Sequence, residues 1–343
     1  MGDQLGSISS RSGRSGVAQR GGLRMLIAGM HGFIGSHIAQ AAQSAGVDVV
    51  GLSLEGDIEK SRRFHESIGL SSVVSIAGDA TDADVLRAAI DRYEPDIFVN
   101  AVGVIRTPPT TRWLADYAVN YATAAATVDA LAMTDSAEKP FVIWIGSQAE
   151  YGEATPPWTE TTPAQPSSAY GASKQVASAL ILAGQRSKLF DSCVVRLPIV
   201  FGPGQAPTLI IASAICSALG GRKLPMTAGS QRRRFAYAPD IGSSVVALGR
   251  QGTSGSTPAL MNFPASEPIE IRWVVQLLET LMPTMQVDLG ALEYRPGEQL
   301  DAWPDCSLAE SIGLTALTPL DQALAETVAW YQDNPWFAED FAS

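Results

Sequence analysis

Residues 23–35 read LRMLIAGMHGFIG, an apolar run that leads directly into three glycines spaced three residues apart. The apolar part, 23–29, is typical of a buried parallel strand. The glycines Gly29, Gly32 and Gly35 permit a tight turn, close approach of the backbone to a pyrophosphate, and close packing of a helix on the strand. The stretch therefore predicts the first βα unit of a dinucleotide-binding fold.

A helix is predicted directly after this turn, over 34–45, because Ile34, Ile38 and Ala42 recur on one face. The N-terminus of a helix offers unpaired N–H groups and the positive end of a dipole to phosphates. Phe33 and Ile34 are therefore expected to bind the pyrophosphate of the cofactor. His31 is expected to be an exposed turn residue without a catalytic role.

Strands and helices alternate beyond this unit. Strands are predicted at 47–54, 72–78, 96–103, 140–147 and 192–202, and helices at 82–93, 113–133 and 170–187. Such alternation implies right-handed crossovers and a parallel, doubly wound sheet, so the expected class is α/β of Rossmann type. Further helices are predicted at 208–220, 239–250, 270–282 and 318–333.

The predicted organisation has three parts. Residues 1–22 are rich in Gly, Ser and Arg and are expected to be a disordered leader. Residues 23–195 form the nucleotide-binding domain. Residues 196–343 form mainly a smaller α/β substrate domain, with some segments returning to the sheet.

Composition narrows the possible functions. The chain has 343 residues, a net charge of −11 and only 17% charged residues, which argues against a nucleic-acid partner. Three separate cysteines without a CxxC pair predict neither a metal site nor a disulfide framework. No apolar run is long enough to span a bilayer, so we expect no membrane association and a cytoplasmic protein.

The end of the second predicted strand bears on cofactor choice. An acidic residue there would bind the adenosine ribose and repel a 2′-phosphate, but the chain has Ser53, with Arg62 nearby. This pattern favours NADP(H), with NAD(H) possible because Glu55 could reach the ribose. Asp79 and Ala80, after the third strand, are placed to hold the adenine.

The catalytic candidates are Tyr170, Lys174 and Ser147. Tyr170 and Lys174 are four residues apart and share a helix face. An ammonium beside a phenol should lower the pKa of the tyrosine from about 10 towards neutrality, making it a usable acid or base. Ser147 ends the fifth predicted strand, where ligands bind in such sheets.

The order of GMHGFIG, NAVG (100–103), VNYAT (119–123), the Ser147 strand, YGASK (170–174) and RLPIVFGPG (196–204) resembles the extended short-chain dehydrogenase/reductases. The most similar subgroup is the NAD-dependent epimerase/dehydratase family, which acts on nucleotide sugars. A downstream GSQRRRFAYAPDI (229–241) fits the same resemblance, which runs from about residue 23 to the C-terminus.

This resemblance implies further site residues. Asn100, Ala101, Gly103 and Pro198 would line the nicotinamide, and Asn120 would anchor a water or a main-chain kink near the lysine. Arg233 would bind the diphosphate of the nucleotide sugar, and Arg295 would assist it. A guanidinium suits this role because it donates two parallel hydrogen bonds to phosphate oxygens. Gln148 would contact the substrate beside Ser147. No metal site is implied.

One departure from the family pattern limits which reactions the enzyme could catalyse. Family 4,6-dehydratases carry an Asp-Glu pair directly after the catalytic hydroxyl residue, but this chain has Gln148 and Ala149. Glu150 comes one place too late and would face the opposite side of a strand. A dehydratase is therefore disfavoured, because no acid and base are poised for elimination.

Reduction or epimerisation remains. The working hypothesis is NAD(P)H-dependent reduction of a nucleotide-linked 4-keto-6-deoxyhexose, with the proton coming from Tyr170. The alternative is a 4-epimerase with tightly bound NAD. Ile199, where the family has a diphosphate-binding asparagine, leaves a second alternative, a carbonyl reductase on a non-nucleotide substrate. A cofactor-sensing protein without catalysis is disfavoured because Tyr170 and Lys174 are both present.

The helices predicted at 113–133 and 170–187 are rich in alanine. Small residues let helices approach closely, and the family resemblance implies dimerisation through these two helices. We therefore expect a homodimer.

Overall fold

The central element of the fold is a seven-stranded sheet whose strands all run parallel. The computed structural model describes residues 22–105, 115–136, 138–255, 257–295, 297–315 and 318–340, so the leader expected at 1–22 lies almost wholly outside the described residues. The strands, in their order across the sheet, are β11 (Leu260–Asn262), β6 (Ser192–Leu197), β5 (Phe141–Ser147), β4 (Ile97–Asn100), β1 (Arg24–Ala28), β2 (Asp48–Ser53) and β3 (Val74–Ala77). The predicted α/β, doubly wound class is confirmed.

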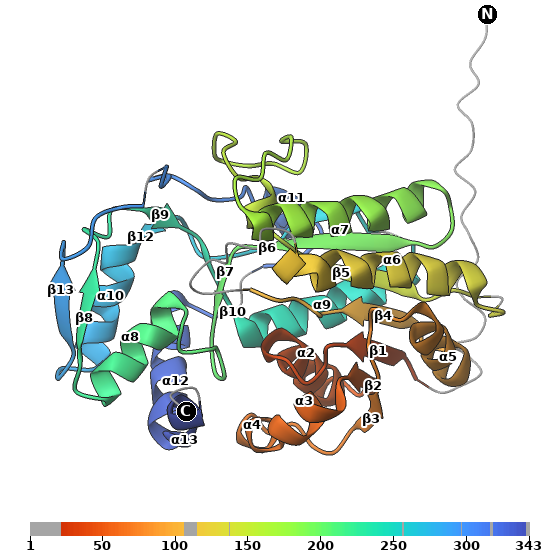
Figure 1. The fold of residues 1–343 in the computed structure, drawn as a ribbon, viewed down its shortest axis with the longest axis horizontal. Helices are drawn as coiled ribbons and strands as arrows, with labels where there is room; N and C mark the ends of the chain where they lie inside the picture. Colours follow the sequence, from red (N-terminus) through yellow and green to blue (C-terminus); the bar gives the residue numbers. More distant parts are fainter. Residues whose placement is uncertain are drawn as a thin grey trace, which may run out of the picture.

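Helices cover both faces of this sheet (Figure 1). On one face lie α2 (Phe33–Ser44) and α9 (Ala238–Thr253), and on the other α5 (Ala83–Tyr93), α6 (Ala118–Met133) and α7 (Ala169–Arg186). Strand residues alternate between the two cores: Met25 and Ile27 face α2, while Leu26 and Ala28 face the opposite helices. The strand order reverses between β1 and β4, which is where ligands bind in such sheets.

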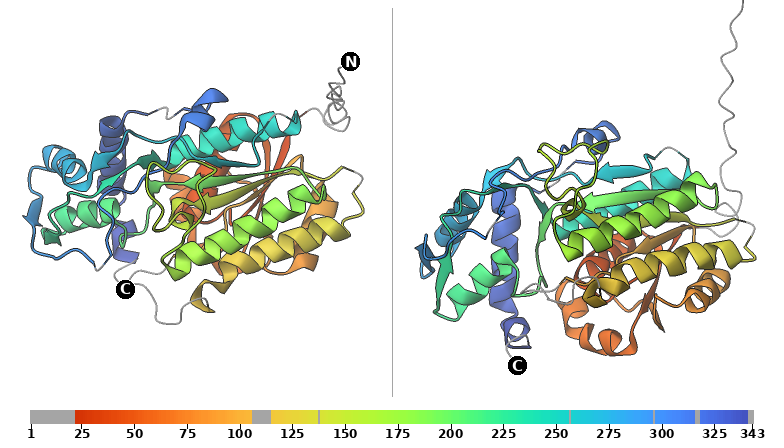
Figure 2. Two further views of the ribbon diagram at one scale, coloured as in Figure 1. Left: turned by 90° about the horizontal axis from the view of Figure 1, so that it is seen from above. Right: turned by 45° about the horizontal axis from the view of Figure 1, so that its top comes forward.

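The C-terminal elements form a second apolar core beside the sheet (Figures 1 and 2). They are β7 (Ile199–Phe201), α8 (Ile210–Leu219), β8 (Lys223–Met226), β9 (Arg232–Arg233), β10 (Phe235–Tyr237), β12 (Ile269–Glu270), α10 (Ile271–Leu281), β13 (Gln286–Leu289), α12 (Leu320–Asp333) and α13 (Trp336–Asp340). Three segments of this part of the sequence, α9, β11 and α11 (Ser307–Ser311), pack with the sheet instead. The domain boundaries themselves stay predictions.

Several element boundaries differ from those expected. The strand predicted over 192–202 is interrupted at Pro198, which has no N–H to donate, and its second half pairs with β10. The helix predicted from 113 begins at Ala118 after a 3₁₀ turn at Ala115–Tyr117, and 113–114 lie outside the described residues. Three short helices were not predicted, because their sequences lack a clear apolar period. They are α3 (Glu55–Lys60), α4 (Arg62–Ser67) and α11 (Ser307–Ser311).

Two negative findings apply to the described part of the chain. No helix there is long and apolar enough to cross a membrane. The same residues contain no group of three or more His, Cys, Asp or Glu side chains that could hold a metal ion. The three cysteines are buried free thiols.

Candidate active site

The glycine turn joins three strands at their carboxyl ends. Gly29 has a φ of +76°, which favours glycine, and its N–H donates to Leu52 O at 2.8 Å. A Cβ on Gly29 would lie 2.9 Å from Val102 N, after β4. A Cβ on Gly35 would lie 2.1 Å from Gly29 O. These contacts require glycine at both positions and bring the helix as close to the turn as a pyrophosphate site needs.

The N-terminus of α2 is free to bind an anion. Gly32 is the N-cap, no side chain caps the helix, and its first turn contains no acidic residue. The first bond of the helix joins Ser36 N to Gly32 O at 2.9 Å, so the N–H groups of Phe33, Ile34 and Gly35 precede the helical ladder. This geometry is compatible with a pyrophosphate, and the predicted role of Gly29, Gly32, Phe33, Ile34 and Gly35 in cofactor binding stays a prediction.

The expected adenosine-side residues lie at the ends of β2 and β3. Ser53 is buried, and its Oγ accepts from His31 N at 3.3 Å. Arg62 is exposed on α4, and the neighbouring Arg63 lies over the Trp336 ring at 4.1 Å. Asp79 is exposed and accepts from Thr81 N at 2.8 Å, next to the buried Ala80.

The expectation for His31 was wrong, because its side chain is only 8% exposed. The imidazole is covered by His65, whose ring centroid lies 5.0 Å away. A turn residue usually faces solvent, but here a helix that the sequence pattern did not predict, α4, folds over it.

The expected nicotinamide-side residues meet where β4, α6 and α7 converge. Asn100 is buried: its Oδ1 accepts from Val102 N at 2.9 Å, and its Nδ2 has no partner. Asn120 binds both main-chain groups of Val104, accepting at 2.7 Å and donating at 3.0 Å, and also donates to Ser173. It therefore holds the chain after β4 in place against α7.

Gly103 lies at this junction, beside Lys174, the lysine predicted to be catalytic. A Cβ on Gly103 would lie 3.8 Å from Asn120 Oδ1 and 3.8 Å from Lys174 Nζ. Ala101, which donates its N–H to Ala28 O at 2.9 Å, completes the link between β4 and β1.

Ser147, Tyr170 and Lys174 come together at the carboxyl end of β5. Tyr170 stands in the first turn of α7, and its hydroxyl is close enough to the Ser147 side chain for the two to interact. Ser147 Oγ also accepts from Ala149 N at 3.2 Å. Lys174, one turn further along α7, donates from Nζ to Ile145 O at 2.6 Å. A hydroxyl pair with an adjacent ammonium can hold and move a proton at a substrate oxygen.

The expected effect on the pKa of Tyr170 was wrong for this structure. Burial raises that pKa above its usual 10, and the Ser147 side chain only partly offsets this rise. Lys174 points its ammonium at a carbonyl oxygen instead, and burial lowers its own pKa to about 8. A phenol with a raised pKa keeps its proton at working pH, so Tyr170 can accept the proton of a substrate hydroxyl only after it has lost its own, a loss that the positive charge of Lys174 favours.

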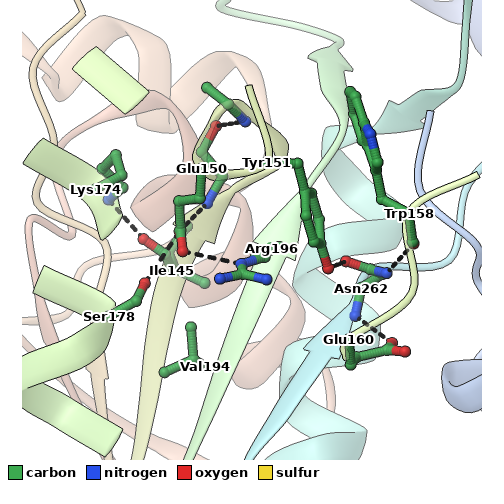
Figure 3. A network of polar contacts seen from close by, with 12 residues as sticks. Ile145, Glu150, Tyr151, Trp158, Glu160, Lys174, Ser178, Val194, Arg196 and Asn262 are labelled. Atoms are coloured by element: carbon green, nitrogen blue, oxygen red, sulfur yellow. Dashed lines mark hydrogen bonds and ion pairs between the residues drawn. The ribbon is translucent and has the colours of Figure 1, made fainter. Parts of the chain in front are cut away.

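A buried ion pair that the sequence pattern did not reveal joins Glu150, which follows β5, to Arg196 on β6 (Figure 3). Glu150 is fully buried, and its Oε2 accepts from Arg196 Nε at 2.9 Å. Its Oε1 accepts from Ser147 N at 2.9 Å and from Ser178 Oγ at 3.0 Å. Glu150 therefore fixes the backbone that carries Ser147. The expectation that it lies on a strand was wrong, because Gln148–Glu150 form a 3₁₀ helix whose first turn it caps, but its carboxylate is engaged inside the protein.

The same network continues towards the C-terminal segments (Figure 3). The Arg196 guanidinium lies 4.4 Å from the Tyr151 ring centre, and Tyr151 donates to Asn262 Oδ1 at 2.7 Å. Asn262 Nδ2 donates to Trp158 O at 2.8 Å and to Asp305 O at 3.0 Å. One chain of contacts thus connects the end of β5 to β11 and to residues beyond it.

The expected substrate arginine, Arg233, is held by the loop that also carries Arg295. Its Nη2 donates to Glu298 Oε1 at 3.0 Å and to Gln299 O at 2.8 Å, and its Nη1 donates to Leu300 O at 3.2 Å. Arg295 is exposed. The structure brings this loop to Arg233 but pairs the guanidinium with a carboxylate.

The two neighbours of Arg233 are also paired. Arg232 forms two hydrogen bonds with Asp301, at 2.8 and 2.7 Å, and Arg234 lies 3.6 Å from Glu267. The run of three arginines is therefore balanced by three separate carboxylates.

Two remaining predicted residues, Gln148 and Pro198, lie beside the catalytic strand ends. Gln148 follows Ser147, and its Oε1 is buried without a partner. Pro198 is buried between β6 and β7. A cavity of about 490 Å³ elsewhere, lined by Phe201, Tyr237 and Phe263 among others, includes none of Ser147, Tyr170 and Lys174. The chemistry is therefore assigned to the strand ends and not to this cavity.

Comparison with known proteins shows the family of the chain. Residues 25–263 match the model of the NAD dependent epimerase/dehydratase family, and the chain belongs to that family. The chain is thus an enzyme of the extended short-chain dehydrogenase/reductase type, and the predicted resemblance is confirmed.

Characterised relatives include two dTDP-glucose 4,6-dehydratases. The one from Shigella flexneri is 26% identical over 94% of this chain and 96% of that protein. The one from Neisseria gonorrhoeae is 30% identical, but over only 52% of this chain and 54% of that protein.

Solved structures share the fold. A dTDP-glucose 4,6-dehydratase from Streptomyces venezuelae, with NAD bound, has a TM-score of 0.79 at 19% identity and covers 93% of this chain and 100% of that one. A UDP-glucuronic acid 4-epimerase from Bacillus cereus, with UDP-glucuronic acid and NAD, has a TM-score of 0.77 at 21% identity and covers 91% of this chain and 99% of that one.

The residues missed from sequence are Glu150, Arg196 and His65. Arg196 lies within the apolar run SCVVRLPIVF, and a charge in a buried strand needs a charged partner. That signal could have pointed to Glu150. No comparable signal identified His65, because α4 is short and polar.

Proposed function

We propose that this enzyme oxidises and re-reduces a single carbon of a nucleotide-linked hexose, as a 4-epimerase does, and removes no water. The observation that carries the proposal is the environment of Glu150. Gln148 and Ala149 occupy the two positions after Ser147, and the nearest following carboxylate is committed to Arg196, Ser178 and the Ser147 amide. Elimination needs an acid and a base at the sugar, and these positions supply neither.

Each side chain of the site has its own role in the proposed reaction. Tyr170 holds and returns the proton of the reacting sugar hydroxyl, and Ser147 binds the same oxygen. Lys174 lies one helical turn away, where it holds the nicotinamide ribose and supplies positive charge as Tyr170 loses its proton. Asn120 keeps the chain after β4 against α7. When bound, the nicotinamide supplies the hydride acceptor and donor for the carbon.

The cofactor proposed here is NAD. The expected preference for NADP(H) depended on Ser53 and Arg62. Ser53 Oγ is already bonded to the His31 amide, and Arg62 is exposed beyond it. The neighbouring Arg63 is stacked on Trp336. Without a cation directed at the ribose, a 2′-phosphate would have no counter-charge. The solved relatives described above hold NAD.

A nucleotide sugar is proposed as the substrate because Arg233 offers a guanidinium that could bind a diphosphate. In this structure the guanidinium contacts Glu298, Gln299 and Leu300, which follow Arg295 closely in the sequence. A diphosphate would replace Glu298 as the partner of Arg233, because it offers two oxygens and more charge. A ketoreductase acting on a nucleotide-linked 4-keto sugar is the second candidate, since Ser53 replaces the acidic residue typical of tightly held NAD.

Incubation of the enzyme with UDP- and dTDP-linked hexoses, followed by proton NMR, tests the proposal. Appearance of the C4 epimer without added cofactor is the expected result. Consumption of NADH or NADPH with a 4-keto sugar, and no epimerisation, would establish the ketoreductase. Turnover of simple ketones but no sugar nucleotide would favour a carbonyl reductase.

A further inference from the structure

A buried carboxylate lies between α7 and the sheet. Glu150 is fully buried, and Figure 3 shows its side chain between Lys174 and Ser178 on one side and Arg196 on the other. Its Oε1 accepts from Ser178 Oγ on α7 at 3.0 Å, and its Oε2 accepts from Arg196 Nε on β6 at 2.9 Å. One oxygen therefore faces α7 and the other faces β6.

The end of β5 leaves room for this carboxylate because residue 146 is a glycine. A Cβ on Gly146 would lie 2.8 Å from Glu150 Oε1. The same oxygen accepts from Ser147 N at 2.9 Å, and Lys174 Nζ donates to Ile145 O at 2.6 Å. The carboxylate and the ammonium thus bind the two peptide groups that flank Gly146.

The contacts of Glu150 fit its ionised form. Its three partners are a guanidinium, a main-chain N–H and a hydroxyl, and all of them donate to it. An ionised carboxylate only accepts hydrogen bonds. Burial raises the pKa of Glu150, and the positive charge of Arg196 opposes this rise. The pair therefore keeps a negative charge inside the protein next to α7.

Lys174 is the cation on which this negative charge acts. It is buried, which lowers its pKa to about 8, and the charge of Glu150 opposes the shift. Two other neighbours do not titrate. The Trp144 ring of β5 lies 5.9 Å from Nζ, and Gly103, after β4, presents no side chain. The charge of Glu150 therefore offsets part of the cost of burying the ammonium.

Two phenols lie close to the same group. Tyr170 precedes Lys174 by one helical turn, and Tyr117, in the 3₁₀ turn before α6, lies 6.0 Å from Tyr170 between ring centroids. Burial raises the pKa of Tyr170, and the charge of Glu150 adds to this rise against the opposing effect of Ser147. Glu150 therefore acts on both proton-handling side chains in the same direction.

We propose that Glu150 is a positioning residue for proton transfer, which holds Ser147 through its main-chain N–H and keeps Lys174 in its ammonium form. The inference rests on the proposed function, in which that ammonium supports the loss of the Tyr170 proton. Because Glu150 is fully buried, it acts through Ser147 and Lys174 and not on the substrate.

Titration of Lys174 in the full chain, without substrate or cofactor, tests the inference most directly. NMR of protein carrying isotope-labelled lysine can follow each ammonium, because the chain has only five lysines: Lys60, Lys139, Lys174, Lys188 and Lys223. Lys174→Arg assigns the signal. The wild-type signal is expected to titrate with a pKa of about 8.

Glu150→Gln removes the charge but keeps an acceptor for Ser147 N. It should lower the pKa of Lys174 by about one unit, because the ammonium loses the opposite charge beside it. Glu160→Gln is the matched control. Glu160 also accepts from a main-chain N–H, that of Asn262 at 2.8 Å, but on β11, further along the sheet. This control should leave the Lys174 titration unchanged.

The pH dependence of turnover separates an electrostatic role from a structural one. With a sugar nucleotide as substrate, the maximum of kcat/KM should move to lower pH by about one unit in Glu150→Gln, because loss of a negative charge lowers the pKa of both Lys174 and Tyr170. A lower kcat with an unmoved maximum would show that Glu150 only supports the main chain, and would overturn the inference.

The double variant Glu150→Leu/Arg196→Met covers the case in which Glu150→Gln does not fold, since it leaves neither charge buried. It should also lower the pKa of Lys174, by a smaller amount, because Glu150 is the partner bonded to α7. An unchanged Lys174 titration in these variants would overturn this inference and leave the proposed function standing. A wild type that is inactive on every sugar nucleotide would instead overturn the proposed function, while the titration would still support the effect of Glu150 on Lys174.

Discussion

Glu150 and Arg196 face each other inside the protein, with 0% and 7% of their side-chain surfaces exposed. Breaking such a pair leaves one buried charge without compensation, whereas replacing both partners by apolar residues removes the charge altogether. Arg196→Met should therefore lower the free energy of unfolding by about 3–5 kcal/mol. The measurement is urea unfolding followed by circular dichroism.

The double variant Glu150→Leu/Arg196→Met is the control for this pair. It should recover most of the lost stability, because no charge stays buried. If the single and double variants were equally unstable, the effect would come from packing, and the argument from uncompensated charge would be wrong.

Tyr170 is the residue on which the proposed proton transfer depends. Tyr170→Phe keeps the ring but removes the hydroxyl that lies beside Ser147, so kcat should fall by about a hundredfold to ten-thousandfold. Cofactor affinity, measured separately by calorimetry, should change little. Tyr117 lies 6.0 Å from Tyr170 between ring centroids, and Tyr117→Phe is the matched control. Near-normal turnover in Tyr170→Phe would contradict the assigned role.

His37 makes the stability of the fold dependent on acid pH. Burial lowers its pKa from 6.5 to about 4, while its hydrogen bond to Pro203 partly opposes the shift. The pKa of His37 in the folded state lies below its pKa in the unfolded state. The contribution of neutral His37 to the free energy of unfolding is therefore complete above pH 6.5 and is lost as the pH falls towards 4. It amounts to about 3 kcal/mol.

Urea unfolding of the wild type and His37→Gln across pH 4 to 7.5 measures this effect. The glutamine cannot gain a proton, so the stability of the variant should fall less steeply with acid. Parallel curves for the two proteins would show that His37 contributes nothing to the pH dependence.

At the scale of single elements, the turn between β1 and α2 tolerates no added methyl group at Gly35. A Cβ there would lie 2.1 Å from Gly29 O and 2.7 Å from Met30 Cα. Gly35→Ala should lower the free energy of unfolding by about 3 kcal/mol or more and abolish NAD binding, because the helix must move away from the turn. Calorimetry and thermal unfolding measure the two effects.

Gly56 on α3 is the matched control, because a Cβ there meets nothing within 4 Å. Gly56→Ala should raise stability by about 0.5–1 kcal/mol through the lower entropy of the unfolded chain. An unaltered affinity for NAD in Gly35→Ala would refute the role given to the turn.

The elements that the sequence predicted well are those with a strong periodic pattern. The apolar strands β1 and β5 and the long helices α2, α5 and α7 end within a few residues of the expected positions. The short strands β9 and β12 contain only two residues each, too few to show alternation. Helix α4 is polar on most of its surface and was not foreseen, and with it the burial of His31 was missed.

The proximity of Ser147, Tyr170 and Lys174 could be predicted from sequence because their spacing follows from the helix and strand that carry them, while their catalytic role stays a prediction. The partners of Arg233 could not, since Glu298 is 65 residues away and only the fold brings the two together. The same is true of Glu150 and Arg196, which are 46 residues apart. Long-range pairing of charges depends on the whole molecule and leaves little trace in a local pattern.

At the scale of the whole molecule, α6 and α7 lie side by side on one flank of the sheet (Figure 2). Val176 on α7 is 43% exposed and Met133 on α6 is 48% exposed, so this flank carries uncovered apolar side chains. The proposed homodimer would cover them. Val176→Glu should convert the dimer to a monomer in light scattering at micromolar concentration.

Leu289 on β13 is 52% exposed and far from these helices in sequence and in the fold, and Leu289→Glu should leave the dimer intact. A wild type that is monomeric at this concentration would contradict the proposed assembly.

The most direct test of the central claim is the mass of the sugar nucleotide after reaction. The purified enzyme is incubated with dTDP-glucose and UDP-linked hexoses in the presence of NAD, and the products are analysed by mass spectrometry and NMR. We expect a product of unchanged mass with inverted configuration at C4, because no carboxylate follows Ser147 at the next two positions. A product lighter by one water would show that the enzyme is a dehydratase and that its acid and base lie elsewhere.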